Sequence, residues 1–195
     1  MSISLPARAS GSKTNGKKAL HTVSAWATEA NLVLGQVATE EKSNEITAIP
    51  LLLKMLELRG AIVTMDAMGC QKEIATGVRE RGADYVLQVK GNQEHLEEDI
   101  IGAFAAMGEA GPQERAEQGL DVFETNDSEH GRKEYRCCEA MPVPKTLRNL
   151  AEWKDLRSIT TVPLRHCRPA ANSCRGLFYD EFPSASISTF PRGNS

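Results

Sequence analysis

The sequence of 195 residues has no hydrophobic run long enough to cross a membrane. Such a span needs roughly 18 or more consecutive apolar residues, and no stretch here approaches that length. The polar first 18 residues also lack the apolar centre of a secretory signal. These absences predict a cytoplasmic chain with no membrane partner.

Paired cysteines, a strong net charge and glycine-rich phosphate loops are missing as well. The five cysteines are an odd set without Cys-x-x-Cys spacing, which argues against a disulfide framework or a zinc knuckle. A net charge of −3 does not fit a chain that coats nucleic acid uniformly, although local basic patches are still possible. Without either standard phosphate loop, a small phosphotransferase is a weak hypothesis.

What the sequence does contain is an alternation of short apolar strands with amphipathic helices. After an expected hairpin, strands with β-branched residues alternate with helices whose apolar residues recur at helical spacing. The expected strands cover residues 19–27, 31–37, 61–65 and 84–89, and the expected helices 45–59, 71–81 and 94–107. This order predicts an α/β fold, with a mixed sheet that carries helices on its faces.

Composition changes along the chain predict four segments. Residues 1–18 are polar and aperiodic and are expected to be a loose N-terminal arm, followed by the α/β core over 19–110. A small β-rich extension is expected over 111–162, with strands near 120–125, 132–138 and 158–162. Residues 163–195 have no period and are expected to be an irregular, disordered tail that resembles out-of-frame coding sequence.

Asp66 is the leading candidate for chemistry. It follows the apolar run Ala-Ile-Val-Thr-Met, so it is expected at the carboxyl end of a buried parallel strand, where open α/β sheets place their sites. A carboxylate there can hold a divalent cation, but phosphoryl chemistry needs at least one more acid beside it. The alternative is that Asp66 only caps the turn that follows.

Two other groups are candidate contacts to a phosphate backbone. Lys90, Asn92 and Gln93 lie around Gly91 at the end of the next expected strand, where a base and two amides could contact phosphate. An ordinary turn with a helix cap is the favoured explanation of that loop from its residues alone. Arg132 and Lys133 begin a later strand and are plausible phosphate contacts, whereas the neighbouring Glu134 fits a solvated edge.

Several stretches together resemble the transposases of the H-repeat-associated insertion-sequence group, of the acidic-triad (DDE) type. They span about residues 11 to 162 and read GKKALHTVSAWATEANLVLGQV, EKSNEITAIPLLLKMLEL, AIVTMDAMGCQKEIA, DYVLQVKGNQEHLEEDI and EHGRKE. The resemblance implies a ribonuclease-H-like fold, in which three acids bind two Mg²⁺ or Mn²⁺ ions that activate water and then a 3′-hydroxyl. Asp66 matches the second acid, which makes it the expected catalytic and metal-binding residue.

The other two acids of that pattern are missing. The first belongs to an Asp-Gly-Lys turn just before Gly11-Ser12, and here that place reads Leu-Pro-Ala-Arg-Ala-Ser from Leu5 onward. The third is expected in a helix with a Trp-x-Ile-Glu-Asn motif beyond Val162, where the patternless tail stands instead. The resemblance therefore implies a truncated, incomplete ribonuclease-H-like fold that has lost most of its catalysis.

Two functions remain open on this basis. The first is a transposase fragment whose family role is metal-dependent DNA cleavage and strand transfer, with this copy catalytically inactive. The alternative is a non-catalytic remnant that binds DNA at the insertion-sequence ends, or that associates with an intact transposase or with itself. Whether the chain is an enzyme is left open by the sequence.

Overall fold

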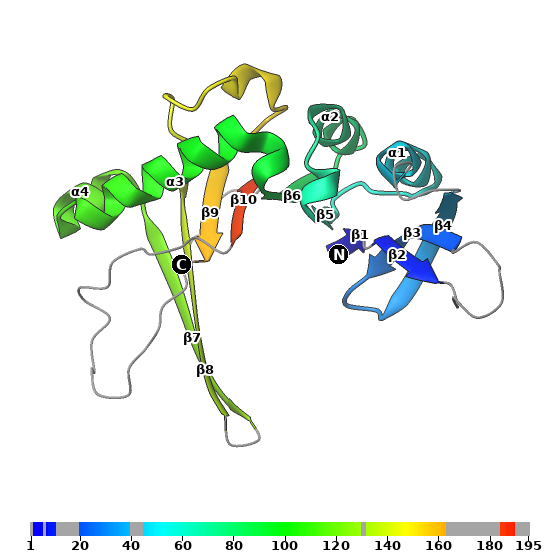
Figure 1. Cartoon of the computed structure of the whole chain (residues 1–195), viewed down its shortest axis with the longest axis horizontal. Coiled ribbons are helices and arrows are strands. Elements are labelled where there is room, and N and C mark those ends of the chain that lie inside the picture. Colours follow the sequence, from blue (N-terminus) through cyan, green and yellow to red (C-terminus); the bar gives the residue numbers. More distant parts are fainter. Residues whose placement is uncertain are drawn as a thin grey trace. The chain divides into compact units, whose positions relative to one another are not determined.

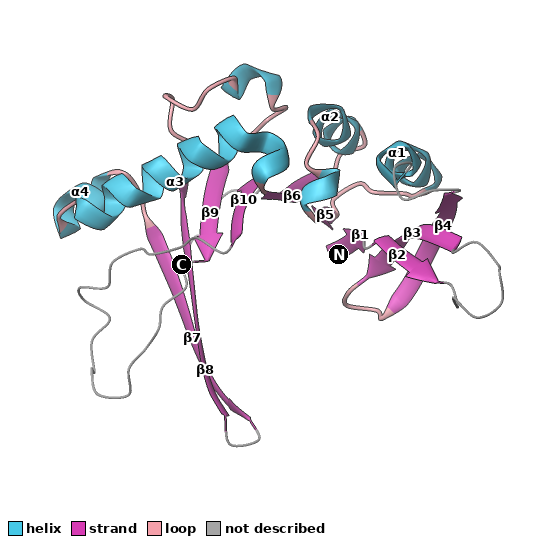
Figure 2. Cartoon of the chain, viewed as in Figure 1, coloured by secondary structure: helices cyan, strands magenta, loops and turns pink. Residues whose placement is uncertain are grey.

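A computed structural model describes residues 2–5, 7–10, 20–39, 45–129, 132–162 and 184–189. These residues fall into two compact units that are not contiguous in sequence: residues 1–88 with 151–155, and residues 89–150 with 156–195. Each unit combines strands with helices (Figures 1 and 2). Among the described residues, no helix has the length and apolar character needed to span a bilayer.

The first unit contains a mixed sheet. Strand β3 (Leu20–Ala27) pairs antiparallel with β4 (Leu32–Thr39) on one side, and on the other side with both β1 (Ser2–Leu5) and β2 (Ala7–Ser10). Strand β1 then runs parallel to β5 (Ile62–Met65), which runs parallel to β6 (Asp84–Val89). The antiparallel strands β2, β3 and β4 together with the parallel strands β1, β5 and β6 give the predicted mixed α/β sheet.

Two helices complete the core of this unit. Helix α1 (Glu45–Met55) packs against β3, β4 and α2 (Lys72–Glu80), so both helices lie over one face of the sheet (Figure 1). They bury apolar residues at helical spacing, as their sequence pattern predicts. These residues are Ala48, Ile49, Leu52 and Leu53 of α1, and Ile74, Ala75 and Val78 of α2.

A short return of the chain, residues 151–155, is also part of the first unit. It includes most of a 3₁₀ turn (Leu150–Glu152) and the buried Trp153. The Tyr85 hydroxyl donates a hydrogen bond to the Lys154 carbonyl oxygen at 2.9 Å, and Arg79 forms an ion pair with Asp155 at 3.0 Å. Lys72 and Glu152 form a further ion pair. These contacts tie the segment to α2 and β6.

The second unit has an antiparallel sheet in the order β10-β9-β8-β7. Its strands are β7 (Asp121–Glu129), β8 (Arg132–Pro142), β9 (Ser158–Val162) and β10 (Ser184–Ser188). Helix α3 (Glu94–Glu109) packs against β9 and β10 and is followed by α4 (Pro112–Glu117). The core between them contains Leu96, Ile100, Phe104, Ile159 and Ile187, each at most 5% exposed.

The structure departs from the sequence analysis at both ends of the chain. Within the expected loose arm, residues 2–5 and 7–10 form strands β1 and β2, because Ile3 and Leu5 alternate with serines and are buried beside β5. Within the expected irregular tail, Ser184–Ser188 form strand β10. Its Ala185 and Ile187 are buried, and the Ser158 and Ser188 hydroxyl oxygens lie 2.7 Å apart. Residues 163–183 lie outside the described residues.

Candidate functional site

Asp66 lies where the sequence analysis expects it, directly after the last residue of β5. Its side chain is exposed, and its Oδ1 accepts a hydrogen bond from the Met68 backbone N–H at 3.2 Å. Asp66 thereby caps a 3₁₀ turn, Ala67–Gly69, which leads into α2. Asp66 therefore does cap the turn, as the alternative interpretation expects. The cap uses only Oδ1, so the second carboxylate oxygen is available to a ligand.

The turn after Asp66 is held by close packing. A Cβ at Gly69 would lie 2.8 Å from both Cβ and Sδ of Met65, so the chain doubles back onto the end of β5 with room only for glycine. Cys70 follows at 0% exposure, and burial raises the pKa of its thiol to about 12. A thiol that stays protonated at neutral pH is a packing group here rather than a nucleophile.

The strand beside Asp66 offers no carboxylate. Leu5 pairs with Met65 in the parallel register of β1 and β5, which places the carboxyl end of β1 next to Asp66. Leu5 is apolar and only 4% exposed, and on the other side of Met65 lies Leu87 at 0% exposure. The first acidic residue of the whole sequence is Glu29, so β1, β2 and β3 contain none.

These residues do not fit a two-metal centre. Two divalent cations need several carboxylates that converge on them, because one acid can neither neutralise nor position both ions. Over the described part of the chain, no group of three or more His, Cys, Asp or Glu side chains lies close enough to hold a metal ion. The third acid is expected beyond Val162, where residues 184–189 are described and contain no carboxylate; residues 163–183 and 190–195 lie outside the described residues.

The loop predicted to contact phosphate follows β6. Lys90 and Asn92 are exposed and Gln93 is half-buried, and Gly91–Gln93 form a 3₁₀ turn at the start of α3. The Gln93 backbone N–H donates to the Lys90 carbonyl oxygen at 2.8 Å. A lysine with its side chain in solvent at the start of a helix can contact an anion.

Arg132 and Lys133 begin strand β8, as the sequence analysis expects of a strand there. Their side chains, and that of Glu134, lie outside the part of the chain that the structure describes. Sequence reasoning passed over two further arginines, Arg59 and Arg81, which line one hollow in the first unit. The overlooked signal is an Arg-Gly-Ala tripeptide that stands before β5 and again before β6.

Comparison with known proteins identifies the family. Residues 4–170 match the family model described as "Transposase DDE domain". Two relatives from Escherichia coli (strain K12) are the H repeat-associated putative transposases YhhI and YbfD. YhhI is 40% identical over 153 residues, and YbfD 41% over 140 residues. The match covers 78% of this chain and 39% of YhhI, and 72% of this chain and 53% of YbfD.

Two further comparisons concern another curated relative and a solved structure. A protein encoded in the dhlA 3′ region of Xanthobacter autotrophicus is 36% identical over 157 residues, which are 80% of this chain and 51% of that protein. Among solved structures, the piggyBac transposase in a synaptic complex with hairpin DNA matches all of this chain and 34% of its own, with a TM-score of 0.50 and 9% identity. The structural likeness supports the ribonuclease-H-like fold alone, and the chain spans about two fifths to one half of these curated relatives.

Proposed function

Because the chain belongs to the Transposase DDE domain family, we propose that it is a transposase fragment that keeps the family's fold and an affinity for DNA without the cleavage chemistry. The family role is metal-dependent cleavage and transfer of DNA strands during transposition of an insertion sequence. Mg²⁺ or Mn²⁺ would supply the activation of water and of a 3′-hydroxyl in a complete site.

The observation that carries this proposal is the pairing of Leu5 with Met65. Strand β1, which ends level with Met65, contains no acid and finishes in a buried leucine, so β1 supplies no second carboxylate to a cation at Asp66. A lone exposed carboxylate binds divalent cations weakly, because Mg²⁺ loses its hydration water only in exchange for well-placed oxygen ligands. Asp66 in this chain is therefore a surviving acid that caps a turn.

The test is a nicking assay on supercoiled plasmid with Mg²⁺ and, separately, Mn²⁺. We expect the chain and its Asp66→Ala variant to give the same product yield as a reaction without protein. Glu109→Ala removes an exposed carboxylate at the end of α3 and serves as the matched control. Metal-dependent nicking that is lost in Asp66→Ala but kept in Glu109→Ala would show that the site is active, and the inactivity proposal would fail.

The DNA-contact residues of this proposal are Lys90, Asn92, Gln93, Arg132 and Lys133. Each lysine or arginine that neutralises one phosphate steepens the salt dependence of DNA binding by about 0.9 in the slope of log K against log[salt]. We therefore expect Lys90→Gln to weaken binding to unrelated DNA sequences equally and to make the slope shallower by about that amount. An unchanged slope would remove Lys90 from the contact surface.

The alternative, a non-catalytic remnant that associates with an intact transposase or with itself, is favoured by strand β4. Leu32, Val33 and Leu34 are 59%, 49% and 40% exposed on a strand whose described pairing is with β3 alone. Adjacent exposed apolar side chains on an edge strand favour association with another chain. Sedimentation of the chain alone, and of the chain mixed with a full-length relative, tests this alternative. A complex that is lost in Val33→Lys supports it. A chain that sediments as a monomer both alone and in the mixture refutes it.

A further inference from the structure

The tripeptide Arg-Gly-Ala occurs twice in the first unit, at residues 59–61 before β5 and at residues 81–83 before β6. Gly60 and Gly82 both have φ of +72°, a conformation that glycine adopts without strain. The Gly60 N–H donates to the Gly82 carbonyl oxygen at 2.9 Å, so the two turns are joined directly. Since β5 and β6 are parallel, both turns lie at their amino ends, the edge opposite to Asp66.

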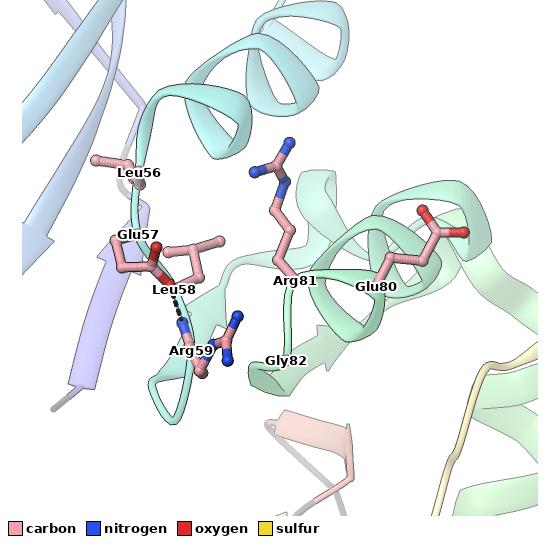
Figure 3. Close-up of a pocket in the computed structure, with 7 residues that line it drawn as sticks. All are labelled: Leu56, Glu57, Leu58, Arg59, Glu80, Arg81 and Gly82. Atoms are coloured by element: carbon pink, nitrogen blue, oxygen red, sulfur yellow. Dashed lines mark hydrogen bonds between the residues drawn. The ribbon is translucent and has the colours of Figure 1, made fainter.

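A hollow of about 480 Å³ lies at these turns (Figure 3). Its lining comes from two segments, the start of the connection from α1 to β5 and the end of α2 with the turn after it: Leu56, Glu57, Leu58, Arg59, Glu80, Arg81 and Gly82. The stem of Arg59 packs near Gly82, where a Cβ would lie 3.5 Å from the Arg59 Cγ. The two turns that carry the arginines are thus in contact, with Arg59 exposed and Arg81 half-buried.

The two guanidinium groups differ from two neighbouring cations of this unit, Lys72 and Arg79. Arg79 and Lys72 form ion pairs with Asp84, Asp155 or Glu152, whereas within the described residues neither Arg59 nor Arg81 has an ion-pair partner. Two acids line the hollow as well. The Glu57 carboxylate accepts a hydrogen bond from the Arg59 backbone N–H at 3.2 Å, and Glu80 points away from both arginines in Figure 3.

We propose that this hollow binds phosphate groups of a nucleic acid backbone through Arg59 and Arg81. A guanidinium group presents its N–H donors in a plane that matches phosphate oxygens, and phosphate contacts position a duplex without reading its sequence. A polyanion is favoured over a single anion because the arginines enter the hollow from two separate segments. This inference rests on the proposed DNA affinity and assigns part of it to an edge of the sheet away from Asp66.

The experiment measures binding of the full chain to a fluorescein-labelled duplex of arbitrary sequence by fluorescence anisotropy, from about 50 to 200 mM salt. The variant is Arg59→Gln with Arg81→Gln, which keeps both glycine turns. If each arginine neutralises one phosphate, the slope of log K against log[salt] becomes shallower by about 2, and affinity at the lowest salt falls roughly 10- to 100-fold. Circular dichroism and the thermal midpoint confirm that the variant is folded.

The matched control is Lys54→Gln with Lys145→Gln, which removes the same charge from two exposed lysines that do not line the hollow. A parent chain that binds and a double arginine variant that behaves like this control would overturn the present inference alone. A parent chain with no DNA affinity would overturn the proposed function as well. Inorganic phosphate that binds the parent but not the variant, with DNA affinity unchanged, would limit the hollow to small anions and also refute the assignment.

Discussion

At the scale of single residues, Gly69 controls the turn that presents Asp66. A methyl group at Gly69 would lie 2.8 Å from two atoms of the Met65 side chain, a distance at which one of the two must move. We expect Gly69→Ala to lower the free energy of unfolding by about 1–3 kcal/mol, the usual cost of overpacking. Urea denaturation measures this loss.

Gly77 provides the comparison for that prediction. It lies within α2, and a Cβ there would have nothing within 4 Å. Alanine at this position is expected to stabilise the chain by up to about 1 kcal/mol, because a helical glycine loses more backbone entropy on folding. Equal effects of alanine at both glycines would mean that the contact with Met65 does not restrict the turn.

The same residues show what the sequence could predict of the candidate site. The position of Asp66 followed from a short apolar run that ends in an acid, because local pattern fixes where a buried strand stops. The strand that ends next to Asp66 could not be predicted from local pattern. It depends on the register of β1 against β5, which joins residues about sixty positions apart. The paired turns at Arg59 and Arg81 depend in the same way on the pairing of β5 with β6.

At the scale of elements, Arg148 forms hydrogen bonds that connect the segment after β8 to helix α3. Its guanidinium donates to Asp99 at 2.8 Å, to Glu98 at 2.7 Å and to the His95 carbonyl oxygen at 2.9 Å. Its backbone N–H also donates to the Asp99 carboxylate, at 2.7 Å. The hydrogen bond from Arg148 lowers the pKa of Glu98 below its ordinary value of 4.5. Because the network is exposed, solvent and salt screen its charges and reduce its contribution to the free energy of unfolding.

This network predicts a pH dependence of stability. Because the pKa of Glu98 is lower in the folded chain, the unfolded chain binds more protons just below pH 4.5, and stability falls as the pH drops through that window. We expect Arg148→Ala to flatten the decrease of the thermal midpoint below pH 4.5 and to lower the midpoint slightly at pH 7. Lys145→Ala, an exposed control on the same connection, should follow the parent curve. Parallel curves for parent and Arg148→Ala would contradict the assignment.

Elements with strong local signals were predicted, and elements that depend on distant partners were missed. The expected strands at 84–89 and 158–162 coincide with β6 and β9, and the expected hairpin with β3 and β4. Strands β1 and β10 are four and five residues long and alternate serine with only two apolar residues each, a pattern too short to identify a strand from the sequence. They form because β5 and β9 offer a paired edge and a core beneath it.

At the scale of the whole molecule, the first unit is completed by residues that follow most of the second unit in sequence. Residues 151–155 belong to the first unit although residues 89–150 and 156–195 form the other. A break of the chain at residue 88 would therefore remove Trp153 and the acceptor of the Tyr85 hydroxyl from the first unit. Because each unit is made of two segments of the sequence, no single cut of the chain separates the two units. We therefore expect the unfolding of one unit to affect the stability of the other.

Trp153→Ala tests that linkage in the full chain. Trp153 is 4% exposed, and loss of a buried tryptophan side chain costs about 3–5 kcal/mol. Lys154→Ala keeps the carbonyl oxygen that accepts from Tyr85 and alters only an exposed side chain, so its effect should stay within about 0.5 kcal/mol. Hydrogen exchange in Trp153→Ala should accelerate at the amides of β5 and β6 first. Faster exchange confined to β7 and β8 would show that residues 151–155 support the second unit instead.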